Sequence, residues 1–189
     1  AIVENYDNVL FSTVEGGFFT SDNQPIYYPK DGSAIDFIAY YPYLPNLISY
    51  TYPIDIYDQV DFMYSNSLKN ASKYNRDNTL IFNRILSKLS IVIESDASFT
   101  VEIKGIKKKA AFSLANGQFT VDELSTGKLL LTPSNKDDSG LKEVSCLLLP
   151  NTEKNSIEVF INQNDNAVYK WIVPHALEKG KYYIYNIKL

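Results

Sequence analysis

The stretch TLIFNRILSKLSIVIESD, residues 79–96, is the longest near-continuous apolar segment of the chain and lies close to its middle. Its apolar residues fall into two sets of opposite parity: Leu80, Phe82 and Leu86 (with Arg84), then Leu89, Ile91 and Ile93. Because strand side chains alternate between two faces, this change predicts a bulge or bend near Ser87 and Lys88. We expect a long bent strand where a smaller first half meets a larger second half, with Leu86 and Leu89 both buried.

The composition favours an all-β protein with a packed core. The 189 residues are enough for one large or two small domains, and the hydrophobic share of 45% is ordinary for a chain that folds around a core. Fifteen tyrosines and ten phenylalanines favour strands, because flat rings pack well on a pleated surface. No segment shows a sustained helical period.

The charge pattern argues against a nucleic-acid partner. The net charge is −4 and the isoelectric point about 5.0, whereas nucleic-acid binding needs a basic face. The one basic run, KGIKKK at residues 104–109, is short and is predicted to be a solvated turn or edge strand. No apolar run reaches 18 residues, so no membrane span is predicted.

The start of the chain carries no recognisable leader. The sequence begins AIVENYDN, without a basic region, an apolar region or an initiator methionine. We therefore expect that a leader has been removed or that the chain is trimmed.

The first half reads as short strands. Two apolar bursts in residues 8–20 are separated by Gly16 and Gly17, which suggests a hairpin. Residues 34–43, AIDFIAYYPY, are apolar on both faces and predict a central strand covered on both sides and ended by Pro42. Residues 56–64 alternate like a half-buried strand. The polar segment 65–78, with a possible helical turn at 68–73, is the expected linker.

The second half shows seven or eight strand signals at a spacing of roughly 10 residues, which is typical of a β-sandwich. Asn116 and Gly117 form the strongest hairpin signal, and the loop NQNDN at 162–166 predicts another. In the last strand, 181–189, alternate residues from Tyr183 to Leu189 share one face. The other expected strands lie at 99–106, 110–115, 118–121, 129–131, 143–149, 155–161 and 167–173.

The sequence offers no catalytic or metal site. His175 is the only histidine and has no second ligand nearby, so a zinc site lacks support, and no nucleophile-elbow motif is present. The single Cys146 excludes an intrachain disulfide and is expected to be a buried thiol. We therefore expect no catalytic residue, no cofactor and no metal.

The acidic clusters are expected to be solvated side chains. Asp55, Asp58 and Asp61 form one cluster, and Asp122 with Glu123 another. Glycoside hydrolysis needs two carboxyl groups facing a cleft, but strand alternation places Asp58 and Asp61 on opposite sides. The 162–166 loop resembles a calcium loop in composition only, because it lacks the central glycine and the final glutamate.

The tyrosine-rich segment is more informative. Exposed aromatic rings can stack on sugars or anchor a protein partner, and buried rings pack in a core or between domains. Both interpretations stay open for this set: Tyr40, Tyr41, Tyr43, Tyr50, Tyr52 and Tyr57.

Several segments together resemble the fimbrillin superfamily of Gram-negative anaerobes of the gut and mouth. They are IDFIAYYPY at 35–43 with Tyr28 and Pro29 before it, DFMYS at 61–65, IFNRILSKLSIVIE at 81–94, CLLLPNT at 146–152, YKWIVP at 169–174 and LEKGKYYIYNIKL at 177–189. The resemblance covers roughly residues 26–189. Arg84 stands where the family often has histidine, and the passage at Tyr28 lacks the family's tryptophan. Neither position is catalytic.

The resemblance implies two transthyretin-like β-sandwich domains in tandem, which we place at 1–75 and 76–189, the first smaller or incomplete. It also implies export as a lipoprotein and display at the cell surface, the outer membrane or a fimbrium. Subunits of this type polymerise by strand exchange after a protease removes an N-terminal strand. Leu189 ends the last family strand without a donor extension, so we expect a tip, anchor or accessory subunit, or a monomeric adhesin.

The leading hypothesis is therefore a non-enzymatic surface protein that acts in adhesion or pilus assembly. Its expected partners are other pilin-type subunits or a host or bacterial surface ligand, without nucleic acid. Membrane contact would come only through a lipid anchor absent from this chain. The alternative is a surface carbohydrate-binding module that uses the tyrosines between residues 40 and 57.

Overall fold

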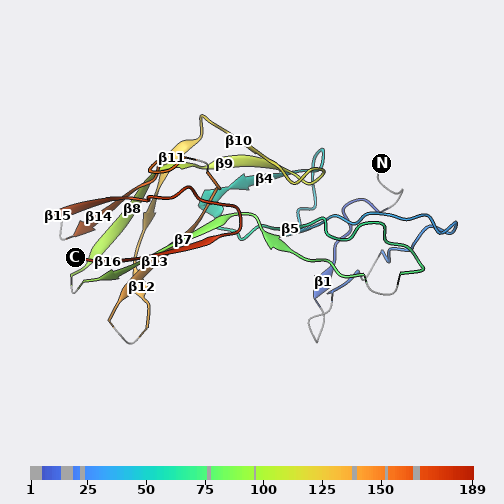
Figure 1. Cartoon of the computed structure of the whole chain (residues 1–189), viewed down its shortest axis with the longest axis horizontal. Coiled ribbons are helices and arrows are strands. Elements are labelled where there is room, and N and C mark those ends of the chain that lie inside the picture. Colours follow the sequence, from blue (N-terminus) through green and yellow to red (C-terminus); the bar gives the residue numbers. More distant parts are fainter. Residues whose placement is uncertain are drawn as a thin grey trace.

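The computed structural model describes residues 6–13, 19–21, 24–75, 78–95, 97–137, 140–151, 153–163 and 167–189. Within them the fold is all-β, as predicted, and the one helical element is a 3-10 turn, η1 (Ile56–Asp58). The molecule is elongated, with β14 to β16 near one end, while the segments of the first half, including the β1 hairpin, extend toward the other (Figure 1).

Two four-stranded sheets fill the second half of the chain. Their strand orders are β11-β8-β14-β15 and β12-β13-β7-β16. Buried residues from both sheets, among them Leu89, Ile91, Val101 and Ile103, belong to one core. The strands are β7 (Ser87–Glu94), β8 (Phe99–Lys107), β11 (Thr126–Leu131), β12 (Ser134–Asn135), β13 (Lys142–Leu148), β14 (Glu158–Gln163), β15 (Ala167–Ile172) and β16 (Tyr182–Lys188).

Three smaller sheets complete the fold, and two of them join the halves of the chain. Their orders are β1-β2, β10-β9-β4 and β3-β5-β6. The strand β4 of the first half pairs with β9 of the second, and β5 pairs with β6. The strands are β1 (Ser12–Thr13), β2 (Phe19–Thr20), β3 (Ala39–Tyr41), β4 (Thr51–Asp55), β5 (Met63–Ser65), β6 (Asn83–Arg84), β9 (Lys109–Ser113) and β10 (Phe119–Val121).

The central apolar stretch bends as predicted, one residue earlier than expected. A bend at Leu86 separates β6 from β7, and Leu86 and Leu89 are both buried. The prediction of one long strand was wrong, because β6 and β7 belong to different sheets. The N–H of Ile85 donates to the carbonyl of Phe62 at 3.0 Å, which holds the chain where it turns into the core.

A second irregularity, at Gly105 in β8, was not foreseen. Gly127 pairs with Ile106 and Lys128 with Lys104, so Gly105 is the extra residue of a β-bulge. Its φ is +76°, in the left-handed region, and a Cβ there would lie 2.1 Å from the carbonyl oxygen of Ser156. This position therefore requires glycine for two reasons: the positive φ disfavours other residues, and no space exists for a Cβ.

An aromatic cluster centred on Phe112 joins the two halves. Phe112 is fully buried on β9 and lies edge-on to Phe62 at 5.2 Å and to Tyr64 at 5.0 Å between ring centroids. Tyr52 on β4 stacks on Phe62 at 4.4 Å, and Tyr40 meets Tyr52 at 5.6 Å. Such aromatic pairs stabilise the fold by more than the burial of their surface area.

The domain boundary between residues 75 and 76 and the tandem arrangement of two sandwiches stay predictions.

The hairpin at Asn116 and Gly117 is confirmed. The side chain of Asn116 accepts from the N–H of Gln118 at 3.0 Å, and Gly117 has a φ of +71°. This turn allows β9 and β10 to pair with Phe112 opposite Phe119. The two other predicted hairpins are β1-β2 and β14-β15, whose turns at Gly16 and Gly17 and at residues 164–166 lie outside the described residues.

The prediction of a covered central strand at residues 34–43 was wrong. Only β3 forms, at the edge of its sheet, and Ile38 is 45% exposed. The preceding residues are held by isolated backbone contacts instead: Ile35 and Ala71 exchange two hydrogen bonds, and the N–H of Phe37 donates to the carbonyl of Leu68. These contacts also fix the expected linker, in which Ala71 is fully buried and the helical turn is not formed.

The prediction of a strand over residues 56–64 was wrong except at its end, because η1 occupies its start and β5 begins only at Met63. The carboxylate of Asp55 accepts from the N–H of Tyr57 at 3.0 Å, which begins η1, and Gln59 then adopts a left-handed φ of 50°. The Gln59 side chain donates to the carbonyl of Leu147 at 3.1 Å and accepts from its N–H at 2.8 Å. In this way Gln59 occupies part of the free edge of β13.

The bulge at Gly105 gives a stability prediction. We expect Gly105→Ala to lower the free energy of unfolding by about 2 kcal/mol or more, because the new Cβ is strained and meets a backbone carbonyl. Urea denaturation measures the change. The control is Gly140→Ala. There φ is likewise positive, at +80°, but nothing lies within 4 Å of the new Cβ. We expect this control to lower the free energy of unfolding by about 1 kcal/mol. Equal losses would contradict the close approach to Ser156.

The Phe112 cluster gives a second prediction. We expect Phe112→Leu to lower the free energy of unfolding by about 1–3 kcal/mol, because a fully buried ring loses its aromatic neighbours and leaves a cavity. The matched control is Phe82→Leu, at a side chain that is 40% exposed, which we expect to cost about 0.5 kcal/mol or less. A Phe112→Leu cost no larger than that of the control would show that the cluster does not stabilise the fold.

Candidate interaction surfaces

The single histidine takes part in an aromatic contact. His175 Nδ1 lies 3.0 Å from the hydroxyl oxygen of Tyr185, and Tyr185 packs against Trp171 with a centroid distance of 4.6 Å. Burial, followed by the nearby Tyr183, raises the pKa of Tyr185. Across the described residues, no group of three or more His, Cys, Asp or Glu side chains is arranged to hold a metal ion.

Cys146 is a core residue, as predicted. It lies on β13 and is 3% exposed. Burial raises the pKa of its thiol to about 12. The thiol is therefore protonated and unreactive at neutral pH, because the thiolate is the nucleophilic form.

Carboxylates of both acidic clusters form local hydrogen bonds or ion pairs. Asp55 begins η1 and lies 3.8 Å from Lys109, while Asp61 binds Arg84 Nε at 2.6 Å. The carboxylate of Asp122 accepts from the N–H of Leu124 at 3.0 Å in a turn. None of these carboxylates lines either of the two cavities described below.

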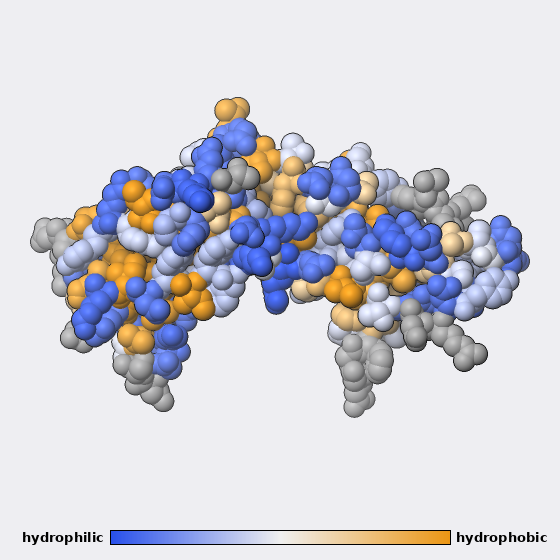
Figure 2. Space-filling view, viewed as in Figure 1, coloured by the Kyte–Doolittle hydropathy of each residue, from blue (hydrophilic) through white to orange (hydrophobic). Residues whose placement is uncertain are grey.

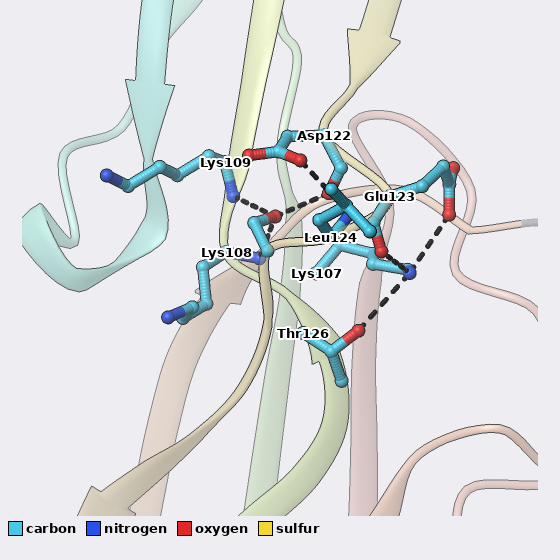
Figure 3. Close-up of polar contacts among 8 residues, drawn as sticks. Lys107, Lys108, Lys109, Asp122, Glu123, Leu124 and Thr126 are labelled. Atoms are coloured by element: carbon cyan, nitrogen blue, oxygen red, sulfur yellow. Dashed lines mark hydrogen bonds and ion pairs between the residues drawn. The ribbon is translucent and has the colours of Figure 1, made fainter.

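Part of the basic run is paired with neighbouring groups, and the contacts of Lys107 are seen in Figure 3. Lys107 Nζ lies 2.9 Å from a carboxylate oxygen of Glu123 and donates to Thr126 Oγ1 at 3.2 Å. Lys108 lies over the ring of Tyr57 at 5.5 Å. With Lys109 paired to Asp55, the run does not form a continuous basic face.

The six tyrosines between residues 40 and 57 divide into two groups. Tyr40 and Tyr52 pack in the aromatic cluster, and burial is the main cause of the raised pKa of each. The other four are partly exposed: Tyr41, Tyr43, Tyr50 and Tyr57. Among the described residues no ring of this exposed group stacks on another ring of the group.

Two shallow cavities lie at the surface. One, of about 480 Å³, lies at the end of the sandwich and is lined by residues that include Glu94, Gln163, Tyr169 and Lys188. The other, of about 430 Å³, is mostly apolar and lies against β4 and β9, beside Leu44, Ile48, Pro53 and Ala111. Neither holds convergent groups suited to acid–base chemistry.

The free edges of the sheets are the more distinctive surface, because unpaired backbone groups there can accept another strand. Most edges are short or blocked. β3 and β10 have three residues each, and β6 and β12 have two. β4 contains Pro53 and its Thr51 N–H is bonded to Ile48, β11 has a register shift at Gly127, and β15 has Lys170 in its middle.

The exception is β16. We call the side of this strand that faces away from β7 the β16 edge. It has seven residues, all in regular register with β7, and contains neither proline nor bulge. Tyr182 and Ile184 on it are 51% and 53% exposed. Figure 2 shows hydrophobic patches among hydrophilic side chains on the end of the molecule that carries β13 and β16. The alternation of side chains in the sequence indicates that β16 is a strand. It does not reveal that, within the described residues, β16 pairs with β7 alone.

The described residues contain no helix long and apolar enough to cross a membrane.

Several proteins of Bacteroides are similar to this chain in sequence or structure. A protein of Bacteroides uniformis named "Putative fimbrium subunit Fim1C" is 27% identical over 200 residues, which cover 94% of this chain. The chain spans only 64% of the length of that relative.

Two solved structures share the fold. A "putative cell adhesion protein" from Bacteroides uniformis aligns with a TM-score of 0.80 and 26% identity, over 95% of this chain and 78% of that one. A protein of the same description from Bacteroides ovatus aligns with a TM-score of 0.69 and 18% identity, over 92% of this chain and 70% of that one, and supports the fold alone.

The family model described as fimbrillin-like matches residues 2–189, almost the whole chain. The sequence motifs, the all-β sheets and this match agree, and the chain belongs to the fimbrillin-like family.

Proposed function

We propose that this protein is a non-enzymatic cell-surface protein that acts in adhesion or as a tip, anchor or accessory subunit of a fimbrium. The observation that carries the proposal is the family match over residues 2–189. The relatives named as a fimbrium subunit and as a cell adhesion protein support the same role. Export, a lipid anchor and a position at the outer membrane are part of the proposal.

Assembly by strand exchange follows from the physics of open sheets. A partner strand that adds to an edge gains a ladder of backbone hydrogen bonds, and its alternate side chains gain pockets. The partners would be other pilin-type subunits. The alternative of a carbohydrate-binding module has less support, because Tyr40 and Tyr52 are packed and the exposed tyrosines do not stack on one another.

The test uses the bacterium that produces the protein. Fimbriae sheared from intact cells are run in sodium dodecyl sulfate without heating and detected with antibodies raised against this chain. We expect a ladder of large species that collapses to one band on boiling, because strand-exchanged subunits share a continuous backbone ladder.

The control is an antibody against a cytosolic protein of the same cells, which should detect nothing in the sheared fraction. Detection of this chain only in the cell lysate would contradict the proposed surface role, and its detection only as a monomer without heating would contradict assembly by strand exchange.

A further inference from the structure

We propose that the β16 edge binds the β16 edge of a second copy of this chain, as an antiparallel pair whose two-fold axis passes beside Tyr185. The two copies would then share one continuous sheet with β16 at its centre. This inference concerns self-association in solution and does not depend on the proposed fimbrial role.

The backbone of β16 has the groups that such a pair needs. The carbonyl of Lys181 accepts from Lys88 of the neighbouring segment, and the N–H of Leu189 donates to Glu94, so both point toward β7. Backbone groups alternate sides along a strand. The backbone N–H and C=O groups of the even-numbered residues therefore point away from β7. On that side the described residues place no strand. The even-numbered residues are Tyr182, Ile184, Asn186 and Lys188.

Only one register pairs the whole strand with itself. With Tyr185 opposite Tyr185 of the second copy, Tyr182 lies opposite Lys188 and Ile184 opposite Asn186, and every residue of β16 has a partner. All four even-numbered residues then form hydrogen-bonded pairs, and Tyr185 forms a non-hydrogen-bonded pair. A shift of two residues leaves ends unpaired.

Side-chain chemistry favours the same register. On one copy Lys88 lies over the Tyr182 ring at 4.9 Å, and Lys188 binds Glu94 at 2.9 Å. Pairing two copies creates the row Lys88, Tyr182, Lys188, Glu94 across the junction. Lys188 of the second copy then lies beside the Tyr182 ring, and the charge of that lysine is balanced by its own Glu94.

The next row contains two apolar side chains, Ile184 and Val92. Ile184 is 53% exposed, while Ser90 and Val92 of β7 are buried although they lie on the same outer face. In the pair Ile184 would lie opposite Asn186 of the second copy, with Val92 beyond it. The exposed isoleucine is thereby removed from water, which favours association.

No other edge offers these features together. Antiparallel pairing of β15 with itself would bring two Lys170 side chains opposite or diagonal to each other. The β4 edge has no N–H at Pro53, and the remaining edges are short or bulged. The β16 edge is thus the long edge of the described residues that has no proline, no bulge and no lysine near its middle.

The first experiment is sedimentation velocity over a concentration series with the whole chain. We expect a reversible monomer–dimer equilibrium. Ile184→Lys should raise the dissociation constant at least about tenfold, because two lysines then approach diagonally across the new ladder. The control is Leu130→Lys on β11, at a residue 69% exposed on another edge, which should leave the constant unchanged.

The second experiment tests the register. Chains with Ile184→Cys are mixed with chains with Asn186→Cys and oxidised mildly. The mixture should form disulfide-linked dimers, because these positions lie about 5.5 Å apart between Cα atoms in a hydrogen-bonded pair. Either variant alone should not, because its two cysteines are diagonal at about 7–8 Å. The native Cys146 does not compete, because it is buried.

A native chain that stays monomeric at every concentration would overturn the proposal. So would a dimer that Ile184→Lys leaves intact while circular dichroism shows a folded variant, or cross-linking that is equally efficient in the single-variant samples. The fimbrial proposal fails separately, through the absence of this chain from sheared fimbriae.

Discussion

The burial of Phe112 between the two halves of the chain is the interaction on which the rest of the structure depends. Its ring contacts Phe62 and Tyr64 from the first half and Phe119 from its own hairpin. β4 lies beside it as an added strand of the same sheet. The first half contributes few long strands, so this shared core supplies stability that its short sheets would lack alone.

Backbone irregularities bring Phe112 to this position. The bulge at Gly105 ends the regular course of β8, and the chain leaves the sandwich to form β9 in another sheet. The bend at Leu86 does the same for β6 and β7. At both irregularities the chain leaves one sheet and enters another. The sheets therefore keep edge strands and do not close into a barrel. Most of these edges are protected, as by Gln59 at β13 and Pro53 at β4, and β16 is not.

Local patterns in the sequence predicted the local structure well. The alternation of Phe99, Val101 and Ile103, the turn at Asn116 and Gly117, and the parity change near Leu86 are short-range signals, and the structure confirms each. Pairing between distant segments could not be predicted in this way. The apolar residues 34–43 suggested a central strand, but burial depends on partners, and only β5 pairs with β3. The open side of β16 and the left-handed φ of Gly105 likewise depend on neighbours far away in the sequence.

A native-state hydrogen-exchange experiment tests the shared core most directly. The carbonyl of Tyr50 and the N–H of Ile56 both bond to the β9 segment, so the amides of Tyr52 and Ile54 face β9 as well. If β4 belongs to one cooperative core, these amides should open with the same free energy as those of Ile91 and Val101 in the sandwich. Opening of Tyr52 and Ile54 at several kcal/mol lower free energy would contradict this account, because the first half would then unfold independently of the second.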